Sequence, residues 1–304
     1  MAMGDAQYSP RPGQAEDLGA GVRRLLAPNP SPMTYRGTNT YLIGAREVAV
    51  IDPGPDDPAH LAAILAALAP GQQITRILIT HSHVDHSALA ARLSRATGAP
   101  VLGFGPSGAG RSAVMRQLAA SGLEEAGEGL DRGFAPDIAL ADGETVAGEG
   151  WTLRAHHMPG HLGNHLCFSL GEVVFTGDLV MGWASSLVSP PDGDLSDFMA
   201  SCRRLRAQGP AVLLPGHGAP VRRPAERIDW LIAHRQEREA QILAALRAGP
   251  ASAGQIAARV YTDTPSALLP AATRNVLAHL LDLYGRGLVA PMDALSQHAR
   301  FRLR

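Results

Sequence analysis

The sequence contains no lysine and only two cysteines among its 304 residues. Without a lysine to reach the phosphates, the glycine-rich stretch 103–110 is better interpreted as a mobile loop than as a nucleotide phosphate loop. Cys167 and Cys202 are too few for a disulfide framework, so we expect a reducing compartment. There is no apolar run of about 18 residues and no basic start followed by an apolar stretch. We therefore expect a cytoplasmic protein that makes no membrane contact.

No strong excess of either charge is present. The 27 basic residues, all arginine, and the 28 acidic residues give a net charge of −1, which excludes a strongly cationic nucleic-acid binder. The charge is uneven, because residues 221–304 hold 12 Arg against 7 Asp and Glu, a net +5, and leave −6 on residues 1–220. With 45% hydrophobic and 18% charged residues, the composition predicts a compact globular protein with a sizeable core.

One stretch of the chain joins an apolar run to a dense group of polar side chains. Residues 74–80 are apolar and partly β-branched and follow Gly71, which predicts a buried strand. Ser87 has the position of an N-cap for a helix that reaches about Ala96. The loop between strand and helix therefore carries four candidate ligands: His81, His83, Asp85 and His86.

The spacing of these four residues suits metal binding. Residues two apart in an extended loop point the same way, so His81 and His83 share one side. Asp85 and His86 offer a second pair a few ångströms further on. Imidazole and carboxylate groups suit a borderline transition metal such as zinc, and two adjacent pairs suit two ions. The alternative is a polar surface loop that is rich in histidine by chance.

Three later segments repeat the layout of an apolar strand, a glycine and a potential ligand. They are residues 151–160, 173–177 and 211–216, and glycine permits close backbone approach at each strand end. The residues that follow them are His161, Asp178 and His217. Each alone would be an ordinary loop residue, but four segments with one layout predict a metal site.

In this order, the seven candidate ligands resemble the pattern of the metallo-β-lactamase superfamily over about residues 35 to 220. The resemblance implies a four-layer αββα sandwich with two divalent metal ions at one edge of the sheets. It assigns one metal to His81, His83 and His161. It assigns the other to Asp85, His86 and His217. Asp178 and a hydroxide would bridge them. We expect zinc, with iron or manganese as alternatives.

Three side chains are candidates for further roles at this site. Asp85 is expected to be catalytic as well as a ligand, accepting a proton from the nucleophile or steering it. His165 either acts on the substrate or orients a metal-bound group, with local hydrogen bonding as the alternative. An acid recurs in the superfamily at the position of Asp52, where it supports either a histidine or the loop backbone. A turn-forming role for Asp52 is equally open.

The composition changes after Pro220. Helical patterns cover residues 228–248, 253–260 and 272–284, and a strand at 288–290 faces a tail at 299–304 that suits an antiparallel partner. Three helices and a β-hairpin form a winged-helix arrangement. This region resembles the small C-terminal domain of one superfamily subgroup, the mitochondrial β-lactamase-like protein 2 type.

These patterns predict three parts of the chain. Residues 1–20 form a flexible N-terminal arm, residues 21–220 the α/β catalytic domain, and residues 221–304 a winged-helix-like domain. In enzymes a winged helix binds nucleic acid, packs against the body or mediates a homodimer, and the pattern does not choose among these.

The resemblance implies a hydrolase that acts through a metal-bridging hydroxide on an ester-like or phosphodiester bond. Members of the subgroup have been linked to single-stranded RNA cleavage, so RNA is one candidate substrate. A thioesterase of the glyoxalase II type is the main alternative, although that family usually has Glu-Tyr where this chain has Gly218 and Ala219. The bridging Asp178 counts against a true β-lactamase, and His83 counts against a flavodiiron oxidoreductase. A metal-dependent DNA-binding regulator is the non-enzyme alternative.

Overall fold

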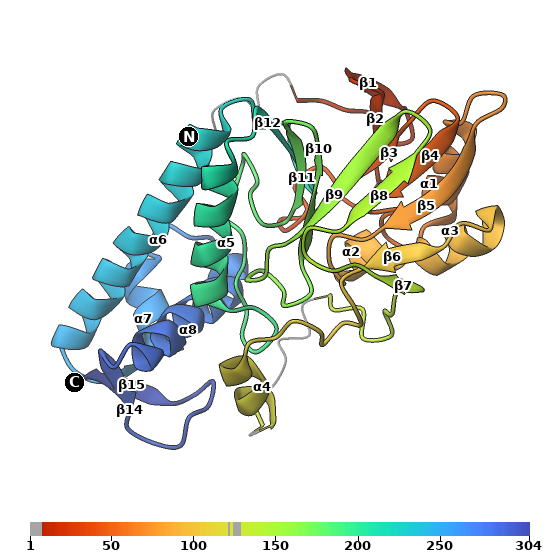
Figure 1. Ribbon diagram of the computed structural model, residues 1–304. Helices are drawn as coiled ribbons and strands as arrows, with labels where there is room; N and C mark the ends of the chain where they lie inside the picture. The colour runs from red at the N-terminus through yellow and green to blue at the C-terminus, as the bar shows by residue number, and fades with distance from the viewer. Residues whose placement is uncertain (1–7, 121, 124–128) are drawn as a thin grey trace.

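The computed structural model describes residues 8–120, 122–123 and 129–304, and two facing β-sheets form its centre (Figure 1). The first sheet has seven strands in chain order. The first four strands pair antiparallel and the last four parallel, with β4 common to both groups. Its strands are β1 (Glu16–Gly19), β2 (Val22–Leu26), β3 (Asn39–Ile43), β4 (Glu47–Ile51), β5 (Gln73–Leu78), β6 (Val101–Gly103) and β7 (Ile138–Ala139).

The second sheet has five strands in the order β12-β11-β10-β9-β8. Only the β11–β12 pair in it is parallel. The strands are β8 (Thr145–Gly148), β9 (Trp151–His157), β10 (Leu166–Leu170), β11 (Val173–Gly177) and β12 (Val212–Pro215). Alternate residues of a strand face opposite sides, so Tyr41 and Ile43 of β3 enter the core between the sheets while Leu42 enters the core behind the first sheet.

Helices cover the outer face of each sheet. Behind the first sheet lie α1 (Pro58–Ala66) and α3 (Ala90–Thr97), whose Ile64 and Leu93 join its core. Behind the second lie α5 (Leu195–Gln208) and the first half of α6 (Pro224–Arg247), with Phe198 and Ile228 in the core there. Because central strands such as β4 and β11 are buried on both faces, they are apolar almost throughout. The predicted αββα sandwich is confirmed.

The C-terminal region has the predicted winged-helix arrangement. After α6 come α7 (Ala253–Val260), the 3₁₀ turn η2 (Ser266–Leu268) and α8 (Leu269–Gly285), and a small sheet in the order β13-β15-β14. Its strands are β13 (Ala251–Ser252), β14 (Val289–Pro291) and β15 (Arg300–Leu303). A capping box formed by Ser252 and Gln255 starts α7.

Helix α6 takes part in two hydrophobic cores. Ile228 lies in the core behind the second sheet, whereas Ile242 lies in the core of the C-terminal region. The second core also takes Met115 and Leu118 from α4 (Ala113–Ala120). The C-terminal region is therefore joined to the sandwich by a continuous helix and by contacts from the body. Within the described residues, no helix combines the length and apolar character needed to cross a membrane.

Two local predictions differ from the structure. Ser87 does not cap a long helix but closes a short one, α2 (Val84–Ser87), and α3 begins separately after Leu89. The Ser87 hydroxyl contacts the His83 carbonyl oxygen and the Asp131 carboxylate, both at 3.0 Å, and so is not free to cap the next turn.

The N-terminal arm was predicted as flexible over residues 1–20, and residues 1–7 of it lie outside the described part. Residues 8–20 pack on the sheet: Tyr8 is buried, its hydroxyl donates to Asn39 Oδ1 at 2.9 Å, and β1 pairs with β2. The aromatic ring of Tyr8, against which the Arg24 guanidinium lies, anchors this segment.

Candidate metal centre

Four strand ends meet at one edge of the sandwich and bring the polar loops together. The loop that holds His81 follows β5, while His161 lies between β9 and β10. Asp178 directly follows β11, and His217 comes just after β12. Hydrogen bonds cross between the sheets here, from Asn39 N to the Gly216 carbonyl oxygen at 2.7 Å and from Leu166 N to the Thr80 carbonyl oxygen at 2.7 Å. The loops are therefore fixed by both sheets.

All seven candidate ligands lie in two adjacent clusters. In each cluster, one ligand atom from every residue lies within 4.8 Å of the others. The first cluster consists of His81, His83, His161 and Asp178, and the second of Asp85, His86 and His217.

The distances between ligand nitrogens of the first cluster are close to those around a tetrahedrally coordinated metal ion. His83 Nδ1 lies 3.0 Å from His81 Nε2 and 3.1 Å from His161 Nε2. Metal–nitrogen bonds of about 2.0–2.1 Å place tetrahedral ligands about 3.4 Å apart. His83 thus presents Nδ1, whereas His81 and His161 present Nε2.

The second cluster has the same spacing. His217 Nε2 lies 3.3 Å from His86 Nε2 and 3.2 Å from Asp85 Oδ2. His86 Nε2 lies 3.4 Å from the same Asp85 oxygen. Three ligand atoms thus face one point, the number of protein ligands typical of an open metal position.

Asp178 lies between the clusters. Its Oδ2 is 3.8 Å from His161 Nε2 and 3.3 Å from His217 Nε2, and its Oδ1 is 3.6 Å from His86 Nε2. Oδ1 is buried and has no hydrogen-bond partner among the described residues. Asp178 is thus a buried carboxylate with an oxygen that lacks a hydrogen-bond partner in the described part of the chain, and it lies among imidazole nitrogens of both clusters. This arrangement fits a ligand that is shared by two cations.

Three of the histidines are oriented by acceptors on their outer side. His161 Nδ1 contacts the Leu187 carbonyl oxygen at 2.6 Å, and His217 Nδ1 contacts the Gly37 carbonyl oxygen at 3.2 Å. His86 Nδ1 contacts Asp52 Oδ2 at 2.9 Å. A nitrogen facing such an oxygen carries a proton, so each Nε2 is the nitrogen that faces the cluster and would give its lone pair to a bound cation.

Comparison with known proteins agrees with this geometry. The family model described as Metallo-beta-lactamase superfamily matches residues 33–217. The chain belongs to the metallo-beta-lactamase superfamily. A second model, Beta-lactamase associated winged helix domain, matches residues 252–294. Both expectations from the sequence, the family and its subgroup, are confirmed.

Among relatives of this superfamily, a Beta-lactamase-like protein 2 homolog from Drosophila melanogaster is 31% identical over 288 residues, covering 89% of this chain and 90% of that protein. An Atrochrysone carboxyl ACP thioesterase from Aspergillus fumigatus is 32% identical over 242 residues, covering 77% of this chain and 67% of that protein. The crystal structure of a metallo-beta-lactamase family protein from Thermus thermophilus gives a TM-score of 0.75 at 27% identity, covering 95% of this chain and 100% of that one.

Asp52 supports the metallo-beta-lactamase loop in both ways that the sequence left open. Besides His86, its carboxylate accepts from Thr80 N at 2.8 Å and from Thr80 Oγ1 at 2.7 Å. Thr80 Oγ1 lies 3.0 Å from His81 Nδ1. One buried carboxylate therefore orients a histidine in each cluster, one directly and one through a hydroxyl. Asp52 also has a left-handed backbone, with φ 51°.

Gly216 is required by the closeness of the ligands. A Cβ atom at this position would lie 2.5 Å from Asp178 Oδ1 and 2.6 Å from His86 Cε1. The glycine that the sequence places before His217 thus lets the strand end approach the bridging carboxylate.

The two clusters differ in how they hold protons. Burial lowers the pKa of His83 to about 3, and burial and neighbouring histidines lower the pKa of His81 well below its ordinary value. Burial also opposes the charge on His217, but Asp178 and Asp85 raise its pKa to about 9. The histidines hold the pKa of Asp178 well below its ordinary value, against burial. The first cluster is thus ready to bind a cation, while the second exchanges a proton for one.

His165, a sequence candidate, lies behind the ligands. It is fully buried, and its Nε2 accepts from the Asp178 backbone N–H at 3.2 Å. Its ring stacks on that of His81 with centroids 5.1 Å apart. These contacts are local hydrogen bonding and ring stacking against metal ligands, the alternative that the sequence left open beside a role at the substrate or at a metal-bound group.

The sequence did not indicate how the loop behind His161 is held. This loop, residues 186–190, supplies the Leu187 carbonyl oxygen that His161 contacts. Asn275 Oδ1, from α8, accepts from Val188 N at 3.1 Å, and Arg235, from α6, donates to the Ser186 carbonyl oxygen.

A second arginine, from α8, reinforces this loop. Arg274 is buried and donates from Nε to Ser189 Oγ at 3.1 Å and from Nη2 to the Pro190 carbonyl oxygen at 2.5 Å. These contacts join residues about 85 positions apart, and no local pattern reveals them. The winged-helix domain thus stabilises the surroundings of a metal ligand.

Proposed function

We propose that this chain, a hydrolase of its superfamily, uses two divalent metal ions to cleave an ester-like or phosphodiester bond. The observation that carries the proposal is Asp178, a buried carboxylate that faces imidazole nitrogens of both clusters. We take zinc as the first candidate for both ions, with iron or manganese as alternatives.

The residues present fit this pair of ions in number, spacing and donor type. His81, His83 and His161 would hold one ion and the second cluster the other, with Asp178 shared. When bound, such ions polarise a carbonyl or phosphoryl oxygen and lower the pKa of water towards neutrality.

Asp85 is the carboxylate best placed to exchange a proton with a reacting group. Its side chain is 21% exposed, against 10% for Asp178, so it faces the open side of the centre. Thr38 Oγ1 donates to Asp85 Oδ2 at 3.2 Å, the oxygen that also faces His217, and this fixes the carboxylate. We assign it the proton-accepting role and treat His165 as a residue that positions Asp178.

A thioester is the second candidate substrate. It is favoured by the relative named Atrochrysone carboxyl ACP thioesterase, which matches 77% of this chain. The glyoxalase II type is a weaker comparison, because it usually has a glutamate where this chain has Gly218. A Cβ at Gly218, which has φ 87°, would lie 2.7 Å from Trp183. Trp183 stacks on Tyr35 with centroids 4.9 Å apart. The site wall after the last ligand is therefore built differently here.

Arg274 of α8 and Arg286 at its C-cap give little support to a DNA-binding regulator. Arg274 is buried in bonds to the loop at 186–190. Arg286 pairs with Glu239 at 2.6 Å and Asp282 at 2.9 Å. Side chains committed in this way are not available to contact phosphates or bases.

The proposal is tested by metal analysis and a substrate panel. Protein purified without chelator should contain about two ions per chain and hydrolyse one member of a panel of carboxylic esters, thioesters, lactones, phosphodiesters and single-stranded RNA. A content well below one ion that added zinc, iron or manganese does not restore would contradict the dinuclear centre. Chelation should abolish the hydrolysis, and re-addition of metal should restore it.

A further inference from the structure

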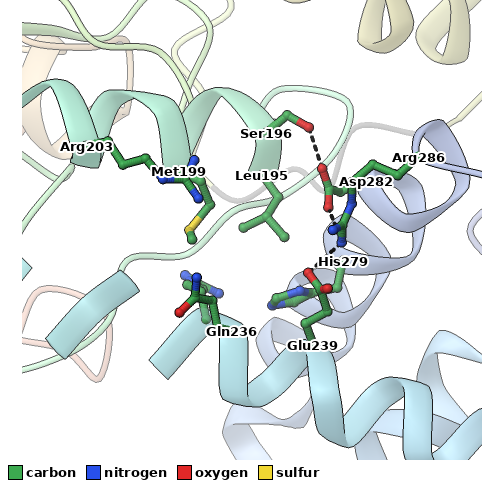
Figure 2. A pocket seen from close by; sticks show the side chains of 10 residues that line it. Leu195, Ser196, Met199, Arg203, Gln236, Glu239, His279, Asp282 and Arg286 are labelled. Carbon is green, nitrogen blue, oxygen red and sulfur yellow. Dashed lines mark hydrogen bonds and ion pairs between the residues drawn. The ribbon is translucent and has the colours of Figure 1, made fainter. Parts of the chain in front are cut away.

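A cavity of about 300 Å³ lies where α5, α6 and α8 meet, at the junction of the sandwich and the winged-helix domain (Figure 2). None of the seven metal ligands lines it. Its volume is at the lower end of small-molecule sites. The cavity is therefore separate from the metal centre and suits a small molecule rather than a polymer.

The acidic groups of the cavity are already neutralised. Arg286 pairs with Glu239 at 2.6 Å and with Asp282 at 2.9 Å, and Ser196 Oγ donates to Asp282 Oδ1 at 2.5 Å (Figure 2). These four side chains form one network along one side of the cavity. They leave no free carboxylate there to attract a cation.

His279, on α8, is the unusual residue of the cavity. It is fully buried, and neither of its ring nitrogens has a hydrogen-bond partner among the described residues. Burial lowers its pKa to about 3, and the charges of Arg235, His234 and Arg286 act in the same direction. The ring is therefore neutral, with one N–H to donate. Buried polar groups of native proteins almost always have a hydrogen-bond partner. The described residues supply none for this ring, so a molecule bound in the cavity is a candidate partner.

Two arginines complete a set of uncommitted donors. Arg235 is buried, and its Nε has no partner among the described residues, although its Nη atoms bind the Ser186 carbonyl oxygen and Asn275. Arg203, on α5, is exposed and forms no ion pair with another described residue. Three arginines and two carboxylates line the cavity, a net charge of +1 with the histidine neutral.

We propose that this cavity binds a small anion with a carboxylate or phosphate group, held by Arg203, Arg235 Nε and the N–H of His279. Guanidinium and imidazole donors are the groups that recognise such oxygens. The same Arg235 secures the loop at 186–190, so an occupant would also stabilise the junction between the two parts of the molecule.

The test follows the ring of His279 in the full-length, zinc-loaded chain. Protein labelled with ¹⁵N-histidine is titrated with inorganic phosphate and, separately, with succinate, and the histidine ring signals are followed by NMR. Comparison of the two titrations distinguishes a phosphate from a carboxylate ligand. His279→Leu identifies the signal, and His279→Gln does so if the leucine variant fails to fold.

Arg203→Ala is the decisive variant because Arg203 is exposed and holds no other described group in place. Arg247→Ala is its control, since it removes an exposed arginine of α6 that does not line the cavity. We expect the His279 signal to shift saturably with at least one anion in the parent and in Arg247→Ala. In Arg203→Ala we expect at least tenfold weaker binding, the effect of one charge-assisted hydrogen bond.

Two outcomes would overturn the proposal. One is a His279 signal that does not respond to either anion. The other is equal affinity in the parent and in Arg203→Ala. Anion binding at the metal centre would shift the ligand histidines and persist in Arg203→Ala, so it is not mistaken for the cavity. Because the measurement does not depend on turnover, the substrate proposal can fail without affecting it.

Discussion

The metal centre and the junction cavity both bury histidine, but they hold it in opposite ways. At the metal centre, His86, His161 and His217 each have an oxygen acceptor on the outer nitrogen, which fixes the ring and its lone pair. In the cavity, His279 has no partner on either nitrogen among the described residues. Histidine held by acceptors is preorganised for a metal ion, whereas His279 offers a donor to an oxygen.

The electrostatic surroundings of the two sites also have opposite signs. Asp178 and Asp85 raise the pKa of His217 to about 9 against the effect of burial. Burial and arginines lower the pKa of His279 to about 3. Besides burial, the charges that act on the ring are carboxylates at His217 and mainly arginines at His279. Carboxylates beside histidines suit a cation at the first site, and the net charge of +1 on the cavity lining suits an anion at the second.

Removal of the bridging carboxylate should have the largest effect on this comparison. Asp178→Ala should lose much of the second metal and lower kcat/KM at least about a thousandfold, because the ion pair loses its shared ligand. Metal content and hydrolysis of the best panel substrate measure this. Asp142→Ala, which removes an exposed carboxylate paired with Arg204, is the control. Near-normal turnover in Asp178→Ala would contradict the bridging role.

Asp52→Ala should weaken metal binding about 10- to 100-fold, the range typical when a supporting partner of metal ligands is lost. Asp52 bonds His86 directly and reaches His81 through Thr80, so both clusters should be affected. Competition with a chelator of known affinity measures the change. Asp52→Asn keeps the size of the side chain but not the charge. If both variants bind metal as tightly as the parent, Asp52 only shapes the turn.

The ligands were predictable because all seven follow one of four apolar strands. Four of them come in one short loop after β5, and His161, Asp178 and His217 each follow a glycine near a later strand end. The dual support by Asp52 was only half predictable, since its bond to His86 spans 34 positions. Residues 8–20 were predicted as flexible, and the ring of Tyr8 anchors them by a contact with Asn39, 31 positions away. Local pattern thus carries information about ligands and elements but little about the long-range contacts that orient them.

The cavity lay beyond prediction for the same physical reason. His279 falls within the apolar stripe of α8, where sequence alone marks it as part of a helix. Only the packing of α5 and α6 against this helix surrounds the ring with arginines. Likewise, Arg274 is bonded to the loop near His161, a contact between segments about 85 positions apart. Burial of a charged side chain is a tertiary property that no local pattern encodes.

Acid stability tests the cavity side of the comparison. The folded-state pKa of His279, about 3, lies below its ordinary value of 6.5. The unfolded chain therefore takes up a proton below about pH 6.5 that the folded chain excludes, and stability falls as the pH drops. His279→Leu should remove about 2 kcal/mol of this loss between pH 7 and pH 5, as measured by urea unfolding in buffer free of phosphate and carboxylates.

The exposed His298 provides the control for this measurement, because His298→Leu removes a histidine without changing a buried one. Its pH profile should follow that of the parent protein. If the stability of His279→Leu shows the same pH dependence as that of the parent, the ring of His279 has a partner in solution that the described residues do not provide. The assignment of a neutral ring is then wrong.

The smallest expected effect tests whether the two regions communicate. Asn275 bonds both Arg235 of the cavity and Val188 N, next to the Leu187 carbonyl oxygen that orients His161. Asn275→Ala should loosen this loop and speed metal loss from the first cluster about three- to tenfold, the effect expected when one or two ordinary hydrogen bonds are lost.

Gln241→Ala is the control, because the side-chain hydrogen bonds of Gln241 to Arg238 and Glu237 stay within α6. Release is followed with a colorimetric chelator in excess. Equal rates in parent and Asn275→Ala would show that the winged-helix domain packs beside the metal centre without influencing it, whereas the expected increase would make the junction part of the support of His161.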